Sequence, residues 1–122
     1  MIPKKLTDAV RKRRLQSVAD LPRRLEERKQ QALQEVYRLV EKFRAEDPEL
    51  GRIVLFGSLG EDRVRSENFD IDLSFEGKEY YQCVDIALKS PFKVDLVDYR
   101  SSAPHIREEI DSRGRVVYDP RS

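Results

Sequence analysis

Two short segments, each combining an apolar strand pattern with polar residues at one end, constrain this chain most. Residues 53–56 are β-branched, aliphatic and aromatic, and Gly57 and Ser58 follow directly. This order is typical of a buried strand that ends in a tight turn. A glycine lets the backbone approach a ligand, and a serine adds a hydroxyl and an N–H that hold phosphate oxygens. The first segment therefore predicts a phosphate-binding turn.

The second segment, residues 70–75, alternates polar and apolar side chains. Alternation places Asp70 and Asp72 on one face of a strand, about 7 Å apart at about 3.3 Å per residue. Two like charges on a half-buried strand favour a cation, and Mg²⁺ binds through one or two carboxylates, water and substrate phosphates. We therefore expect a metal and nucleotide site. The alternative is that both aspartates only face solvent, although aspartate is depleted in strands.

A third strand is predicted at residues 93–99, where alternation puts Asp95 and Asp98 on opposite faces. The two cannot serve one site, and Asp98 is expected to be a turn or cap residue. Cys83 lies on the apolar side of a predicted helix and is expected in the core, whereas His105 is expected at the surface. The further predicted elements are helices over residues 78–89 and 105–112 and an edge strand over residues 116–118.

The first part of the chain is predicted to form two helices, over residues 6–19 and 23–45. Pro22 and the two residues before it are expected to separate them, because proline disfavours helix in the residue that precedes it. We expect residues 1–47 to be a helical extension and residues 48–122 to be the compact domain. The extension either covers the sheet as a helical hairpin or offers a docking surface, with the basic run of residues 11–14 as the contact.

Charge and composition limit the function classes. Lys and Arg (24) nearly balance Asp and Glu (23), but residues 1–44 hold thirteen basic and six acidic side chains. No helix-turn-helix pattern accompanies this basic half, so no nucleic-acid partner is expected. Cys83 is the single cysteine and excludes an internal disulfide. No apolar stretch approaches 18 residues, so no membrane segment is expected and we expect a cytoplasmic protein.

Gly57-Ser58 followed by Asp70-Ile71-Asp72 resembles the signature of the DNA polymerase β-type nucleotidyltransferases. The short chain is similar to their minimal nucleotidyltransferase (MNT) branch, the antitoxins of HEPN/MNT toxin–antitoxin pairs, over about residues 52–118. The resemblance implies an α/β (α+β) nucleotidyltransferase fold. It is a small mixed β-sheet with helices packed on it, here with an N-terminal helical extension.

The resemblance also implies an activity, which is metal-dependent transfer of AMP from ATP to a hydroxyl, that of a tyrosine in a HEPN ribonuclease toxin encoded nearby. It implies that Asp70 and Asp72 hold Mg²⁺ or Mn²⁺. It matches Asp95, by its Val-Asp-Leu-Val context, to a third carboxylate that holds metal and helps to deprotonate the acceptor hydroxyl. Gly57 and Ser58 are matched to the β- and γ-phosphates of the ATP substrate.

The loop over residues 59–69 departs from the family pattern. It is one residue longer than usual, the Ala-Arg-Gly that often follows Gly-Ser is reduced to Gly60-Glu61, and Phe69 replaces the usual serine before the first aspartate. We expect Arg63 or Arg65 to supply the missing cation to the triphosphate. Two alternatives stay open: a non-catalytic antitoxin that masks its partner, and a nucleotidyltransferase for a small molecule of the aminoglycoside type. A DNA-binding regulator is the weakest of the readings considered.

Overall fold

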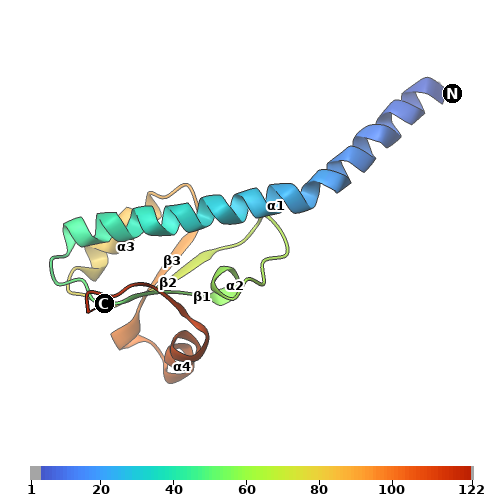
Figure 1. Ribbon diagram of the computed structural model, residues 1–122. Coiled ribbons are helices and arrows are strands. Elements are labelled where there is room, and N and C mark those ends of the chain that lie inside the picture. Colours follow the sequence, from blue (N-terminus) through green and yellow to red (C-terminus); the bar gives the residue numbers. More distant parts are fainter. Residues whose placement is uncertain (1–3, 122) are drawn as a thin grey trace.

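The computed structural model describes the backbone of residues 4–121 and the side chains of residues 21–121. Helices and strands alternate along most of the chain (Figure 1). In order they are α1 (Lys4–Glu46), β1 (Ile53–Phe56), α2 (Gly57–Gly60), β2 (Ile71–Phe75), α3 (Tyr80–Leu88), β3 (Val94–Asp98), the 3₁₀ turn η1 (Tyr99–Ser101), α4 (Pro104–Arg113) and β4 (Arg115–Tyr118). All predicted strands are present, with ends that agree within two residues.

The four strands form one mixed sheet in the order β3-β2-β1-β4. β1 is antiparallel to β2 and to β4, whereas β2 and β3 are parallel and are joined through α3. A parallel pair needs such a crossover, and a helix is its usual form. The expected small mixed sheet is therefore confirmed, and β4 lies at an edge as predicted.

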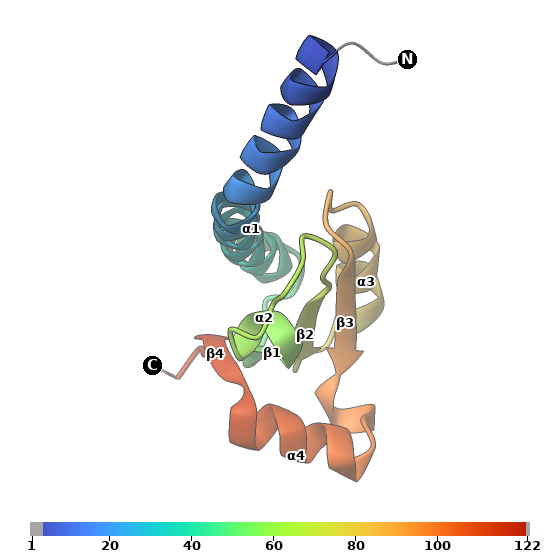
Figure 2. The same cartoon turned by 90° about the vertical axis from the view of Figure 1, so that its right-hand side faces the viewer.

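The main core lies between one face of the sheet and the helices α1 and α3, which cover that face in Figures 1 and 2. Side chains at alternate strand positions point into it, as the period-2 pattern requires. The predicted core position of Cys83 is confirmed. The fully or nearly buried members include Val36, Leu39 and Phe43 of α1, Ile53 and Leu55 of β1, Ile71, Leu73 and Phe75 of β2, and Ala87 of α3.

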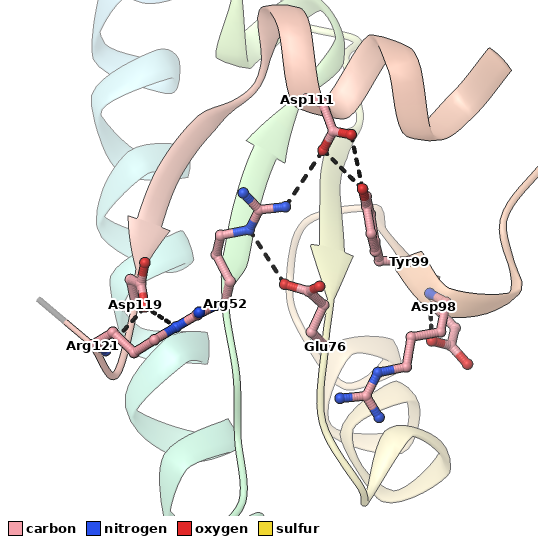
Figure 3. Close-up of polar contacts among 8 residues, drawn as sticks. Arg52, Glu76, Asp98, Tyr99, Asp111, Asp119 and Arg121 are labelled. Atoms are coloured by element: carbon pink, nitrogen blue, oxygen red, sulfur yellow. Dashed lines mark hydrogen bonds and ion pairs between the residues drawn. The ribbon is translucent and has the colours of Figure 1, made fainter. Parts of the chain in front are cut away.

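The opposite face of the sheet is covered by α4. Val54 and Phe56 of β1 pack there against Ile110. A polar network also fixes α4 to the sheet, because Arg52 lies between two carboxylates (Figure 3). Its Nε is 3.2 Å from Glu76 Oε2, and its Nη2 is 3.4 Å from Asp111 Oδ1. Asp111 also accepts a hydrogen bond from the Tyr99 hydroxyl, at 2.8 Å.

The expected break in the N-terminal helices is wrong, because α1 runs unbroken from Lys4 to Glu46 with Pro22 inside it. Proline removes one helical hydrogen bond and can kink a helix without ending it. Leu21 and Pro22 are both exposed, and Figures 1 and 2 show a bend in the blue part of α1. The alternative of a helical hairpin is therefore excluded.

The second half of α1 belongs to the core of the sheet, from Ala32 to Phe43. A division of the chain after residue 47 remains a prediction. The basic run of residues 11–14 belongs to α1, but its side chains lie outside the part of the chain whose side chains the structure describes. None of the helices described here combines the length and the apolar character that a membrane span needs.

Candidate functional site

The site begins at the end of β1, where Gly57 adopts φ +73°. This left-handed conformation is strained for residues with a side chain. A Cβ at Gly57 would also lie 2.3 Å from Asp72 Oδ2, which is shorter than any van der Waals contact. Glycine therefore allows the turn and the carboxylate of Asp72 to lie against each other.

Asp72 stands beside Asp95 in the register of the parallel strands β2 and β3. Paired residues on neighbouring strands point to the same face, with the strands about 4.8 Å apart. Asp70 directly precedes β2, and its Oδ2 lies 3.7 Å from Lys93 Nζ. The register therefore places Asp95 beside Asp72, whereas Asp70 lies just before the paired residues.

The crowding of carboxylates changes the acidity of Asp72. Burial, and then the negative charges of Asp95 and Asp70, raise the pKa of Asp72 from 3.8 to about 6. Glu109 acts in the same direction, and Lys93 opposes it. A half-buried carboxyl with a strongly raised pKa is typical of functional sites. Its charged form is disfavoured there, and a bound cation would stabilise it.

A cavity of about 380 Å³ opens in front of Asp72. Three residues of the predicted nucleotide site, Ser58, Arg63 and Arg65, line it together with the carboxylates of Asp70 and Asp72. The lining residues are Ser58, Arg63, Val64, Arg65, Ser66, Asn68, Phe69, Asp70 and Asp72. The structure thus brings Arg63 and Arg65 to one cavity with Ser58, although the Arg63 guanidinium is engaged by Glu61 Oε2 at 2.9 Å.

Asp95 opens toward a second, neighbouring groove. This groove has a volume of about 370 Å³ and runs along the outer edge of β3, where Tyr81, Asp98 and Ser101 contribute to it. Asp72 thus lines the first space and Asp95, its neighbour in the sheet, lines the second.

The carboxylates alone do not form a closed metal cage, since no group of three His, Cys, Asp or Glu side chains among the described residues is close enough to hold an ion. Mg²⁺ does not require such a cage, because it keeps several waters and takes oxygens from substrate phosphates. Burial and the neighbouring carboxylates disfavour the charged form of Asp72 and raise its pKa, and a bound cation would stabilise that form. The donor set of Asp70, Asp72 and Asp95 therefore fits a divalent cation that arrives with a nucleotide.

Two residues near the site were not singled out from the sequence. Lys93 pairs with Asp70. It lies two residues before Asp95 in the predicted strand 93–99, so alternation could have placed Lys93 on the same face as Asp95. Glu109 of α4 adds negative charge near Asp72, and no sequence pattern linked this helix to the site.

Two further predictions about single residues are confirmed. Asp98 caps η1, since its side chain accepts hydrogen bonds from the Arg100 N–H and the Ser101 hydroxyl. His105 is exposed on α4.

Comparison with known proteins agrees with this geometry. A family model described as polymerase beta, nucleotidyltransferase matches residues 38–122. The fold is similar to a crystal structure of a toxin–antitoxin with AMP-PNP, at 23% identity and a TM-score of 0.57, covering 72% of this chain and 73% of the other. It is also similar to the toxin–antitoxin MntA-HepT, at 22% identity and a TM-score of 0.51, covering 72% and 70%. No curated protein matches.

Proposed function

This chain belongs to the polymerase beta nucleotidyltransferase family, and we propose that it transfers AMP from ATP to a hydroxyl group of a protein. The observation that carries the proposal is that Asp72 pairs with Asp95 and that its carboxylate lies directly against Gly57. Transfer of a phosphoryl-type group needs positioning and charge compensation more than covalent chemistry from the protein. A carboxylate pair beside a glycine turn provides both.

The residues take distinct roles in this proposal. Gly57 and Ser58 hold the β- and γ-phosphates, and Arg63 and Arg65 add positive charge from the loop that lines the cavity. Asp95 faces the neighbouring groove and accepts the proton of the acceptor hydroxyl. The acceptor oxygen then forms a bond to the α-phosphorus, the bond to the bridging oxygen breaks, and pyrophosphate leaves.

Asp70, Asp72 and Asp95 would hold Mg²⁺ or Mn²⁺ together with the nucleotide. When bound, the cation compensates the negative charge on the phosphates during transfer. Asp72 is the carboxylate whose negative charge a cation would stabilise most, because burial and its neighbours make that charge unfavourable.

The acceptor that we propose is a tyrosine of a HEPN-type toxin. Two lines support it: solved toxin–antitoxin pairs share the fold, one of them with AMP-PNP, and the described chain offers an open groove beside Asp95 rather than an enclosed pocket for a small acceptor. A folded partner would complete this groove with its own surface.

The test is to incubate the protein with ATP, Mg²⁺ and a HEPN-type toxin and to measure the mass of the toxin. We expect an increase by one or more adenylate groups. Asp72→Asn and Asp95→Asn should abolish the increase, whereas Asp85→Asn, an exposed aspartate on α3, should leave it unchanged. Normal adenylation by the Asp72→Asn variant would contradict the proposed site.

A second candidate is a protein that masks its partner without transfer. Ion pairs favour it, because Lys93 engages Asp70 and Glu61 engages Arg63. A nucleotide must displace or share both contacts. In the same experiment, a stable complex without any gain of mass would support this second function.

A further inference from the structure

The loop that follows α2 is closed by a pattern of backbone hydrogen bonds. The Arg63 N–H bonds to the Ser58 carbonyl at 2.8 Å, and the Asp62 N–H bonds to the Leu59 carbonyl at 3.3 Å. These two bonds define a Schellman motif, in which the residue at the Asp62 position is left-handed and usually glycine. Asp62 has φ +55°. The direction in which Arg63 leaves α2 therefore depends on the conformation of an aspartate.

That aspartate is held by α1. Lys29 Nζ lies 2.5 Å from Asp62 Oδ1, and the Lys29 side chain is only 17% exposed, against 78% for Asp62. The hydrogen bond between them raises the pKa of Lys29 and lowers that of Asp62. Figures 1 and 2 show the loop between α2 and β2 reaching up to α1.

The same stretch of α1 also contacts the loop before β3. The Arg28 guanidinium lies 3.8 Å from the centre of the Phe92 ring, and Glu35 accepts a hydrogen bond from the Ser90 hydroxyl. Lys93, the partner of Asp70, comes directly after Phe92. One face of α1 therefore contacts both loops that flank the carboxylate site.

We propose that Lys29 is a positioning residue for the nucleotide, and that it acts through Asp62 to hold Arg63 at the phosphate cavity. The inference rests on the proposed nucleotide transfer. Lys29 precedes the region that the family model matches, so this chain supplies the support from its own N-terminal helix. Asp62 takes the place of the usual glycine because its carboxylate gives α1 a point of attachment.

A positioning role and a simple charge effect make opposite predictions for Asp62. If Lys29 and Asp62 only set the electrostatic potential, Asp62→Asn removes a negative charge near a polyanion and should tighten ATP binding. If the pair positions Arg63, Asp62→Asn should weaken binding. Asparagine tolerates the left-handed conformation about as well as aspartate, so the backbone itself is not strained further.

The experiment measures the Kd of a fluorescent ATP derivative with Mg²⁺ at fixed ionic strength. Lys29→Met and Asp62→Asn should each raise the Kd about 3- to 10-fold. This is the change expected when only about a tenth to a third of the molecules hold the loop in the conformation that binds ATP. The double variant should lose no more than either single one, because both act through one contact. Lys29→Arg should bind as the wild type does. In transfer assays, KM for ATP should rise while kcat at saturating ATP stays the same.

Lys78→Met is the matched control. It removes an ion pair with Glu49, at 3.4 Å, beyond the opposite end of β2, and should not change the Kd. The inference would be overturned if Asp62→Asn bound ATP as tightly as the wild type, or if Lys29→Arg and Lys29→Met raised the Kd equally. Nucleotide binding by the wild type would still support the proposed function in that case. A wild-type protein that binds no nucleotide would overturn both.

Discussion

Asp72 and Asp95 are direct neighbours in the parallel pairing of β2 and β3, and their approach is one reason why the pKa of Asp72 rises to about 6. Two carboxylates in this position destabilise the metal-free protein. This cost agrees with the proposed role of the two carboxylates in binding a cation.

The first prediction concerns stability without metal. The pKa of Asp72 is about 6 in the folded protein and 3.8 in the unfolded reference, so between these values the native state binds more protons. Stability must then fall as the pH rises through this window, by up to about 3 kcal/mol. Asp72→Asn should remove this loss, and urea unfolding with EDTA should show a gain of about 1–3 kcal/mol at pH 8 that fades toward pH 4. An equal gain at both pH values would contradict the electrostatic cause, and Asp85→Asn should show none.

The second prediction concerns the cation. In the presence of a fixed concentration of ATP, Mg²⁺ should raise the thermal midpoint of the wild type at pH 8, and free Mg²⁺ at about 100 times its Kd corresponds to about 2.7 kcal/mol. The increase should be smaller at pH 5, because protonated Asp72 competes with the cation below its pKa of about 6. Asp72→Asn should show little increase at either pH. Equal stabilisation of the wild type and this variant would place the cation elsewhere.

The third prediction concerns Gly57. Gly57→Ala places a Cβ 2.3 Å from Asp72 Oδ2 on a backbone with φ +73°. We expect a loss of about 1–3 kcal/mol in the free energy of unfolding and a fall in transfer of about 100-fold, since a displaced carboxylate misplaces the reacting groups. The loss of stability should be smaller in an Asp72→Ala background, which removes the clash and keeps the backbone strain. Equal losses in both backgrounds would contradict the contact.

Much of the site was predictable from the sequence because its geometry is local. Alternation along a strand decides the face of each side chain, so Asp70 and Asp72 were assigned to one face before their strand was paired. Asp95 was matched to the site through the family resemblance. The same rule placed Asp98 on the opposite face from Asp95. Asp98 caps η1 as expected, but both residues line the groove at the edge of β3. Gly57 was identified by its position after an apolar strand, and its positive φ agrees with that interpretation.

The contacts that support the site were not predictable, because they join distant parts of the chain. Lys29 and Asp62 meet only once α1 lies across the sheet, and no local pattern pairs them. The continuity of α1 through Pro22 was not predictable either, because proline can kink a helix or end it and no local pattern decides between the two. The charge of Glu109 reaches Asp72 through the placement of α4, which a network centred on Arg52 holds (Figure 3).

The last prediction concerns Asp47, a buried carboxylate at the end of α1 that is only 1% exposed. Its Oδ1 accepts the Glu49 N–H at 2.9 Å, and its Oδ2 accepts the N–H groups of Lys78 and Glu79 at 2.8 and 2.9 Å. One side chain thus joins the end of α1 to the start of α3.

Asp47→Ala leaves these three N–H groups without their acceptor. Since each hydrogen bond to a charged group contributes about 1.5–3 kcal/mol, and water can replace some of them, we expect a loss of about 3–5 kcal/mol in urea unfolding. Asp47→Asn keeps one acceptor oxygen and turns an amide toward the remaining donors, so its loss should be intermediate. Asp85→Ala, which removes an exposed carboxylate paired with Lys89, should change stability by less than about 0.5 kcal/mol. A value for Asp47→Ala within that range would show that the carboxylate does not secure α1 to α3.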